Sequence, residues 1–251
     1  VGRDVLFTYE RAEISPGEIV LDVAGLTVRG DRGQLALRGA SLAVRRSEIV
    51  GVAGVSGNGQ RGLAEAITGL RPVEEGSVRL AGADITGSSA HSISAAGIGS
   101  VPEERMRFGV VPSLVVYENA VLKHQRDRVF SRRALLDFAS IRDHARRIVE
   151  SFGVMTPSLK EPLRNLSGGN IQKLIVGREF SAEPALLVAA HPTYGLDVGA
   201  TEYIRKRLLE QRARPGHPFG DNPHRLHIGV GILAVAAMGG FGVTLQAMIQ
   251  E

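Results

Sequence analysis

The spacing of apolar residues changes from strand-like to helix-like along the chain. Between residues 18 and 52, apolar and polar residues alternate, and this period of two predicts short antiparallel strands joined by polar turns. Val78 and Leu80 predict one more strand between the turn-forming residues Gly76 and Gly82. The apolar positions that carry the first strands are Val20, Leu26, Val28, Leu35, Leu37, Leu42 and Val44.

The middle of the chain follows a helical period, and a short apolar run lies on each side of it. Between residues 112 and 163, the apolar positions that form one helical face are Ile141, Ala145, Ile148, Val149 and Phe152. The runs 48–53 and 186–190 each read as a short strand, and the second suits a strand buried in a parallel sheet. The chemistry that the sequence suggests begins where these two runs end.

A glycine-rich loop follows the first apolar run. Gly54 and Gly59 stand in the frame of a phosphate-binding loop, G-x-x-x-x-G-K-[ST], with Gly57 and Asn58 between them. In the full pattern, backbone amides wrap around the phosphates, a lysine lies between the outer two, and a hydroxyl binds Mg²⁺. The loop is therefore a candidate nucleotide contact, and the alternative is an ordinary strand-to-helix turn without a ligand.

Two substitutions damage this loop. Gln60 replaces the lysine and carries no charge, so the charge-assisted contact with the phosphates is lost. Arg61 replaces the hydroxyl, and a permanent cation cannot ligate Mg²⁺ and would repel it. We expect loose nucleotide binding through the loop amides at most, and no rapid hydrolysis at this site.

The end of the second apolar run also lacks the residues that the ATPase pattern requires. In phosphate-loop ATPases, an Asp at the end of such a strand holds Mg²⁺ through water, and a neighbouring Glu often polarises the attacking water. Ala190 and His191 occupy these places. Alanine cannot bind an ion, and a mostly neutral imidazole replaces a carboxylate poorly at pH 7, so we expect no intact catalytic residue in this site.

A Ser-Gly-Gly turn at Ser167, Gly168 and Gly169 is the most informative feature of the chain. Two glycine amides, a hydroxyl and the positive end of a helix dipole would converge there, which suits an anion. The turn precedes apolar residues at helical spacing, so we expect it to open a helix with a buried face. The alternative is an ordinary loop ahead of a core helix. The apolar residues are Ile171, Leu174, Ile175 and Phe180.

Taken in order, these motifs resemble the nucleotide-binding domain of an ABC transporter. The resemblance is carried by the loop frame 54–59, the Val-Pro-Glu-Glu-Arg segment 101–105, the signature turn 166–170 and the Pro-Thr-Tyr-Gly-Leu-Asp segment 192–197. It extends to about Arg214. More narrowly, the motifs resemble the second of two ATPase domains in fused subunits of bacterial importers of simple sugars and nucleosides, in which the phosphate loop is often decayed.

This resemblance implies an α/β fold with a P-loop NTPase core of the ABC type. The core would have a mixed sheet, an antiparallel β subdomain and an inserted helical subdomain at about 112–170. ABC domains act as head-to-tail pairs, so the turn 167–169 would complete the ATP site of a partner ATPase domain. Glu103 would be the coupling residue toward transmembrane permease subunits, and Asp197 would belong to the D-loop. ATP and Mg²⁺ would be held mainly by the partner.

Two hypotheses about function follow from the resemblance. In the first, the chain is a peripheral ATPase component on the cytoplasmic face of the membrane, and it needs a partner domain for hydrolysis because autonomous ATPase activity is not expected. In the second, it is a truncated, non-catalytic interaction module that docks on ABC domains or permeases. The first is the one that the signature turn favours.

The ends of the chain depart from the family pattern or lie outside it. Residues 1–15 resemble a linker remnant, residues 16–214 the nucleotide-binding domain, and residues 215–251 form an atypical tail. The family continues with another core strand at this point, but the prolines within 215–224 exclude a buried strand there. The apolar run 228–243 leaves three readings: a frameshifted or rearranged gene end, a packed helix that replaces lost strands, or a membrane segment.

Composition changes this picture little. The chain of 251 residues has no cysteine, which excludes disulfides and thiolate metal ligands. Its net charge is +4, but the basic residues are scattered, so we expect no nucleic-acid partner. His217, His224 and His227 lie in a Pro/Gly-rich stretch without supporting ligands, so we expect no metal site of their own. No N-terminal signal peptide is visible.

Overall fold

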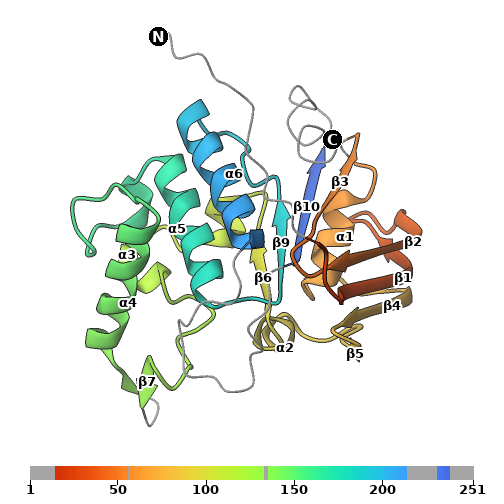
Figure 1. Ribbon diagram of the computed structural model, residues 1–251, viewed down its shortest axis with the longest axis horizontal. Coiled ribbons are helices and arrows are strands. Elements are labelled where there is room, and N and C mark those ends of the chain that lie inside the picture. The colour runs from red at the N-terminus through yellow and green to blue at the C-terminus, as the bar shows by residue number, and fades with distance from the viewer. Residues whose placement is uncertain (1–14, 56, 133–134, 214–230, 238–251) are drawn as a thin grey trace.

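The computed structural model describes residues 15–55, 57–132, 135–213 and 231–237, which form two four-stranded sheets, a two-stranded sheet and a group of helices (Figure 1). One four-stranded sheet is antiparallel and the other is parallel. The predicted α/β class is therefore confirmed, with the two strand directions separated into two sheets. The predicted linker remnant lies almost entirely outside the described residues.

The antiparallel sheet has the order β2-β1-β4-β5. Its strands are β1 (Ile19–Arg29), β2 (Leu35–Arg45), β4 (Glu75–Leu80) and β5 (Ala83–Asp84). Val20, Val28 and Val44 are fully buried, as the alternating pattern predicted. Val78 pairs with Val23 across β4 and β1, which confirms the strand predicted between the two turn glycines.

The parallel sheet has the order β3-β10-β9-β6. Its strands are β3 (Ile49–Gly54), β6 (Ile98–Val101), β9 (Leu186–Ala190) and β10 (Gly231–Ala237). Leu187 and Ala189 of β9 enter one hydrophobic core, while Leu186 and Val188 enter the other. Because both faces of the sheet are covered, its strands are apolar at successive positions, as buried parallel strands commonly are.

Strand β10 corrects the expectation that the tail contributes no core strand. It pairs in parallel with β3 on one side and β9 on the other, so it is a central strand of the sheet. The proline argument concerned residues 215–224, which lie outside the described residues, and the strand is supplied by the later apolar run. The packed-helix reading is therefore wrong for residues 231–237. In the described portion of the chain, every helix is too short or too polar to cross a membrane.

The helices divide between the two sides of the parallel sheet. Helix α1 (Gln60–Ile67) lies on the side of the antiparallel sheet, whereas α5 (Gly168–Ser181) and α6 (Val198–Ala213) cover the opposite face (Figure 1). A single turn of 3-10 helix, η2, precedes α5 at Leu163–Asn165. Helix α2 (Ala90–Ala95) precedes β6, and a π-helical turn, η1 (Arg105–Gly109), follows it.

A helical region stands apart from the sheets and includes α3 (Val116–Asn119), α4 (Phe138–Ser151) and a short hairpin of β7 (Ser131–Arg132) and β8 (Leu135–Leu136) (Figure 1). In α4, the predicted apolar face is buried: Ile141, Ala145 and Ile148 are at most 3% exposed. This helical period is confirmed because the face packs against α3 and α5.

Candidate functional site

The glycine loop connects β3 to α1, as the sequence predicts. Gly57 and Gly59 have φ of 94° and 92°, a left-handed conformation that favours glycine. A Cβ on Gly59 would also overlap the carbonyl oxygen of Ala36 in β2, so this position needs glycine for space as well. The strand-loop-helix frame that a phosphate loop requires is therefore present in this part of the chain.

The side chain of Gln60 lies within this loop. Its amide nitrogen donates a hydrogen bond to the carbonyl oxygen of Val55 at 3.2 Å, and the residue is 8% exposed. The same nitrogen would collide with a Cβ on Gly54, so the amide lies against the first glycine of the loop. Where the phosphate-loop pattern places a lysine directed at phosphates, this chain has a neutral group bonded to the loop itself.

The side chain of Arg61 is held in a network of ion pairs. Its Nε lies 2.6 Å from Glu65 Oε1, and Arg71 joins Glu65 to Asp31 through contacts of 2.5 and 2.6 Å. The hydrogen bond from Arg71 and the charges of Arg71 and Arg61 hold the pKa of Asp31 below its ordinary value. The position where the pattern requires a metal-binding hydroxyl is thus occupied by a cation paired with a glutamate.

Ala190 and His191 mark the end of β9. His191 has φ of 47°, and its amide donates to the carbonyl oxygen of Val235 in β10 at 2.8 Å. Its Nε2 lies 3.9 Å from Glu103 Oε1, so the residue in the place of the catalytic carboxylate faces the predicted coupling residue. Among the described residues, no group of three His, Asp or Glu side chains forms a metal site. The residues present here do not fit Mg²⁺.

The signature turn has the geometry of an anion site. Ser167 is the N-cap of α5: its hydroxyl accepts from the Asn170 amide at 3.4 Å and from the Asn170 side chain at 3.0 Å. Gly168 and Gly169 are the first two residues of the helix, where backbone N–H groups have no partner within the helix. The buried face predicted behind the turn is confirmed, since Ile171, Leu174 and Ile175 are at most 2% exposed.

Asp197 lies directly behind this turn. Its Oδ1 accepts from the Ala200 amide at 2.8 Å in the first turn of α6. A Cβ on Gly169 would lie 3.1 Å from the Ala200 Cβ and 3.6 Å from Asp197 Oδ2, so the glycine allows the two helix starts to pack closely. The structure therefore brings the predicted D-loop residue and the signature glycines together.

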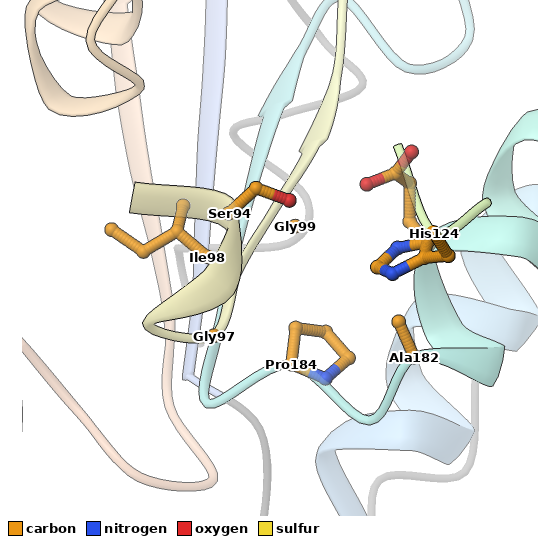
Figure 2. A pocket seen from close by; sticks show the side chains of 8 residues that line it. Ser94, Gly97, Ile98, Gly99, His124, Ala182 and Pro184 are labelled. Carbon is orange, nitrogen blue, oxygen red and sulfur yellow. The ribbon is translucent and has the colours of Figure 1, made fainter. Parts of the chain in front are cut away.

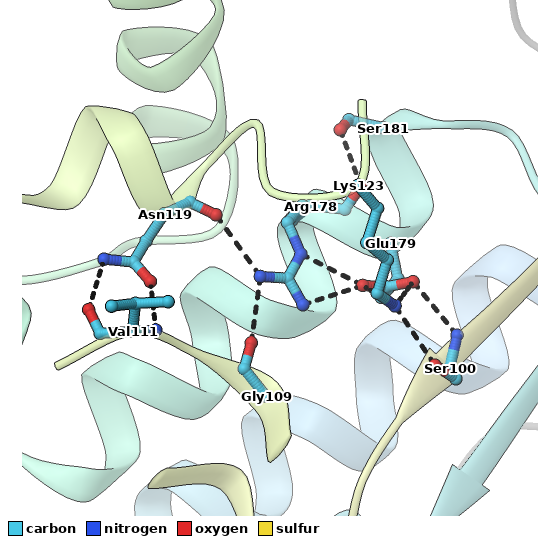
Figure 3. A network of polar contacts seen from close by, with 8 residues as sticks. All are labelled: Ser100, Gly109, Val111, Asn119, Lys123, Arg178, Glu179 and Ser181. Carbon is cyan, nitrogen blue, oxygen red and sulfur yellow. Dashed lines mark hydrogen bonds and ion pairs between the residues drawn. The ribbon is translucent and has the colours of Figure 1, made fainter. Parts of the chain in front are cut away.

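A buried ionic cluster supports α5 from the other end, and sequence reasoning missed it (Figure 3). Glu179 accepts from Lys123 at 2.9 Å, from Arg178 at 2.8 Å and from the Ser100 amide of β6 at 3.0 Å. Burial alone would raise the Glu179 pKa, but the two cations and these hydrogen bonds lower it to about 2. Burial lowers the pKa of Lys123 more than Glu179 raises it.

Arg178 extends the same cluster into the helical region. Its Nη1 donates to the carbonyl oxygens of Gly109 at 3.0 Å and Asn119 at 3.3 Å, at the ends of η1 and α3 (Figure 3). The only sequence signal was an adjacent Arg-Glu pair on a helix that is otherwise mostly apolar. The cluster therefore ties α5 to β6 and to the helical region at once.

A small pocket lies near the start of β6, away from the residues predicted to act (Figure 2). Gly97 and Pro184 form part of its wall on the sheet side, and His124 approaches from the helical region (Figure 2). None of the residues that line the pocket is a predicted site residue, and the Glu179 carboxylate in its wall is bonded to Lys123 and Arg178. Its lining residues are Ser94, Gly97, Ile98, Gly99, His124, Glu179, Ala182 and Pro184.

This fold and these motifs define an ATP-binding domain of the ABC class. The model of the ABC transporter family matches residues 37–194, and the chain belongs to that family. A solved structure of a dimeric ATP-binding cassette, in a post-hydrolysis state bound to ADP and Pi, superposes with a TM-score of 0.68 over 87% of this chain and 88% of its own. At 21% identity, that likeness shows the fold. Members of the family bind ATP with Mg²⁺.

Curated relatives are import ATP-binding proteins. The glucose import ATP-binding protein TsgD13 of Haloferax volcanii is 46% identical over 84% of this chain and 39% of its own length. The nucleoside import ATP-binding protein NupA of Lactococcus lactis subsp. cremoris is 44% identical over 84% of this chain and 42% of its own length. The chain thus spans about two fifths of the length of these relatives.

Proposed function

We propose that this chain is the second, degenerate ATP-binding domain of an importer for simple sugars or nucleosides. In this role the turn 167–169 completes the ATP site of a partner ATPase domain. The proposal rests on the contrast between two sites. The start of α5 has a capped turn suited to an anion, whereas Gln60 is bonded to the glycine loop and Arg61 is paired with Glu65. The names of the relatives, which are import ATP-binding proteins for glucose and nucleosides, support the transported class.

The state of the chain's own site supports the degenerate part of the proposal. The Gln60 amide is bonded to the Val55 carbonyl, and Arg61 is paired with Glu65. Gln60 supplies no positive charge for the phosphates, and Arg61 supplies no hydroxyl oxygen for Mg²⁺. Ala190 and His191 at the end of β9 supply no carboxylate, either to hold Mg²⁺ or to act on water. Hydrolysis by the chain alone is therefore not part of the proposed function.

The proposed assembly is a head-to-tail pair of ATPase domains on the cytoplasmic face of a membrane, bound to permease subunits. Glu103 is proposed to couple the nucleotide state to the permease. Its contact with His191 at 3.9 Å supports a position of Glu103 between the nucleotide site and the permease. Asp197 is proposed to act in the D-loop, behind the signature turn. ATP and Mg²⁺ are proposed to be held mainly by the partner domain.

The experiment combines the chain with the intact nucleotide-binding domain of the same transporter. We expect the chain alone to hydrolyse no ATP above background. The mixture should hydrolyse ATP faster than the sum of the rates of its two components measured separately. Ser167→Ala and Gly168→Asp should abolish this gain, because the first removes the hydroxyl and the second places a carboxylate at an anion corner.

Ser89→Ala is the matched control for these variants. Ser89 is the N-cap of α2 and accepts from the Ser92 amide at 3.2 Å, so its loss removes an equivalent helix cap far from the signature turn in the sequence. Its mixture should keep the gain in hydrolysis. Stimulation that survives both signature variants, or rapid Mg²⁺-dependent turnover by the chain alone, would contradict the proposal.

The alternative function is a non-catalytic module that docks on ABC domains or permeases. It predicts binding to the partner domain without any gain in hydrolysis at any mixing ratio. Sedimentation of the mixture, measured with the same samples, separates the two: a complex that leaves the partner's rate unchanged supports the docking module.

A further inference from the structure

Arg105 joins the segment that carries Glu103 to a turn next to the signature. It is the first residue of η1, two positions after Glu103. Its guanidinium donates from Nη1 to the carbonyl oxygen of Tyr194 at 2.7 Å and from Nη2 to that of Gly195 at 3.2 Å. These contacts link residues separated by about 90 positions in the chain.

The same guanidinium lies against the first glycine of the signature helix. A Cβ on Gly168 would be 2.8 Å from Arg105 Nη2, closer than real Cβ contacts come. A Cβ on Gly195 would be 3.5 Å from the same nitrogen, and Gly195 has φ of 63°. One side chain therefore touches the turn 194–195 and fills the space left beside Gly168.

Arg105 binds the turn as a two-pronged hydrogen-bond donor, here called a fork, rather than through an ion pair. Within the described part of the chain, no carboxylate forms a salt bridge with Arg105, and its two terminal nitrogens are used by two successive carbonyl groups. A planar guanidinium fixes two acceptors at once, which a lysine ammonium does less well. The geometry of the turn is thus tied to the position of Arg105.

A second contact restrains the signature helix from the inner side. Gln172, one turn into α5 and 2% exposed, donates from its side chain to the Pro192 carbonyl oxygen at 2.8 Å. The start of α5 and the segment 192–197 are therefore joined by a buried hydrogen bond. Arg105 contacts the same segment through hydrogen bonds that are exposed to solvent, next to the half-buried Gly168.

We propose that Arg105 is the positioning residue of the signature turn. It holds residues 194–195 and the start of α5 in one arrangement, and it transmits displacements of the Glu103 segment to the corner that the partner would use. Its effect on a partner's hydrolysis rests on the proposed function above, whereas its effect on the isolated chain does not.

The first test measures amide hydrogen exchange in the isolated chain. The reporters are two amides with backbone acceptors: Ile171, bonded to the Ser167 carbonyl, and Tyr194, bonded to the His191 carbonyl. Arg105→Ala should speed exchange at both by about tenfold, the effect of losing charge-assisted hydrogen bonds. Unchanged exchange at these amides would overturn the proposal.

Two further variants separate the fork from the charge. Arg107→Ala is the matched control, since Arg107 lies in the same π-helical turn but is exposed, and its guanidinium pairs with Glu104 and lies over the Phe108 ring. It should leave both amides unchanged. Arg105→Lys keeps the charge and loses the fork, so it should behave like Arg105→Ala. If the two amides in Arg105→Lys exchange as slowly as in the unmodified chain, the positive charge alone positions the turn, which contradicts the proposal.

The second test uses the mixture with the partner domain. Arg105→Ala should lower the kcat of the stimulated reaction by about tenfold to a hundredfold, as misplaced catalytic groups do, with a smaller change in the KM for ATP. Faster exchange without this loss of kcat would overturn the transmitting role. If the unmodified chain gives no stimulation, the proposed function fails, and the exchange result alone then decides whether Arg105 positions the turn.

Discussion

Two neighbouring residues depart from the phosphate-loop pattern, although the strand-loop-helix frame around them is kept. Gln60 and Arg61 begin α1, and each has acquired partners inside the protein: the Val55 carbonyl for the first and the Glu65 carboxylate for the second. Gln60 is bonded to the loop itself, and Arg61 is paired with a residue one turn further along the same helix. The sequence predicted the change of chemistry at both positions. It did not predict the ion-pair network that continues from Glu65 through Arg71 to Asp31, because Asp31 and Arg71 come from other parts of the chain.

A residue-scale prediction concerns Glu179. Glu179→Gln should lower the free energy of unfolding by about 3–5 kcal/mol at pH 7, because it leaves buried cations without their counter-charge. The Glu179 pKa falls to about 2 on folding, so its contribution is fully present above its unfolded pKa of 4.5 and is lost as the pH falls toward 2.

Urea unfolding at a series of pH values provides the measurement. The gap between the unmodified chain and Glu179→Gln should narrow as the pH is lowered from 4.5. Glu150→Gln, at an exposed position near the end of α4, is the control and should change stability little at any pH. A gap that stays constant with pH would show that folding does not shift the Glu179 pKa, which contradicts the prediction.

At the scale of elements, helix α5 combines three tasks. Its first turn forms the signature corner, its apolar face fills one hydrophobic core, and its last turn carries Arg178 and Glu179. The period of the apolar residues predicted the second task, and the Ser-Gly-Gly pattern predicted the first. The ionic cluster was not predictable because its members come from three separate segments, around Ser100, Lys123 and Arg178.

The element that sequence reasoning missed is β10. Its run of glycine, alanine and large apolar residues fits a helix or a membrane segment equally well, since periodicity alone cannot identify a strand covered on both faces. Gly231 shows what fixes the strand: a Cβ there would meet the Arg45 carbonyl oxygen at 3.0 Å, so the chain passes close to the antiparallel sheet. Such long-range packing is not visible in a local pattern.

An element-scale prediction tests β10 directly. Leu233 is fully buried in the core between the two sheets, so Leu233→Ala should cost about 2–5 kcal/mol of unfolding free energy. Leu135→Ala in β8, where the side chain is 76% exposed, is the matched control and should stay within about 0.5 kcal/mol. Chemical denaturation measures both. Equal stability of the two variants would exclude residues 231–237 from the core.

For the molecule as a whole, one sheet separates two hydrophobic cores. The core under α5 and α6 includes Ile204, and the core between the parallel sheet, α1 and the antiparallel sheet includes Ile67. Both cores pack against the strands of the parallel sheet. If one core unfolds, the other core therefore loses the sheet face on which it packs. We therefore expect the two sides to unfold together.

Ile67→Ala and Ile204→Ala test this coupling, since both side chains are fully buried. Each should lower the stability of the same transition by about 2–5 kcal/mol. The measurement is denaturation followed by two probes, far-ultraviolet circular dichroism and amide exchange in each core. If each variant shifts only the probe on its own side, the two cores are independent units.

Taken across these scales, sequence reasoning predicted what short-range patterns determine. The alternation in β1 and β2, the helical face of α4 and the turn that opens α5 are all local, and the structure has them where they were expected. The fork of Arg105 and the position of β10 depend on residues far apart in the chain, so no local pattern could predict them.

The place of β10 also bears on how the protein is made. A ribosome releases β3 and β9 long before residues 231–237, yet these two strands are neighbours only through that last segment. Until it emerges, the nascent chain carries two unpaired strand edges lined with apolar side chains, which is the kind of surface that aggregates or recruits chaperones. The two sides of the parallel sheet therefore cannot be joined before residues 231–237 have been synthesised, and the growing polypeptide remains exposed to misfolding until that point.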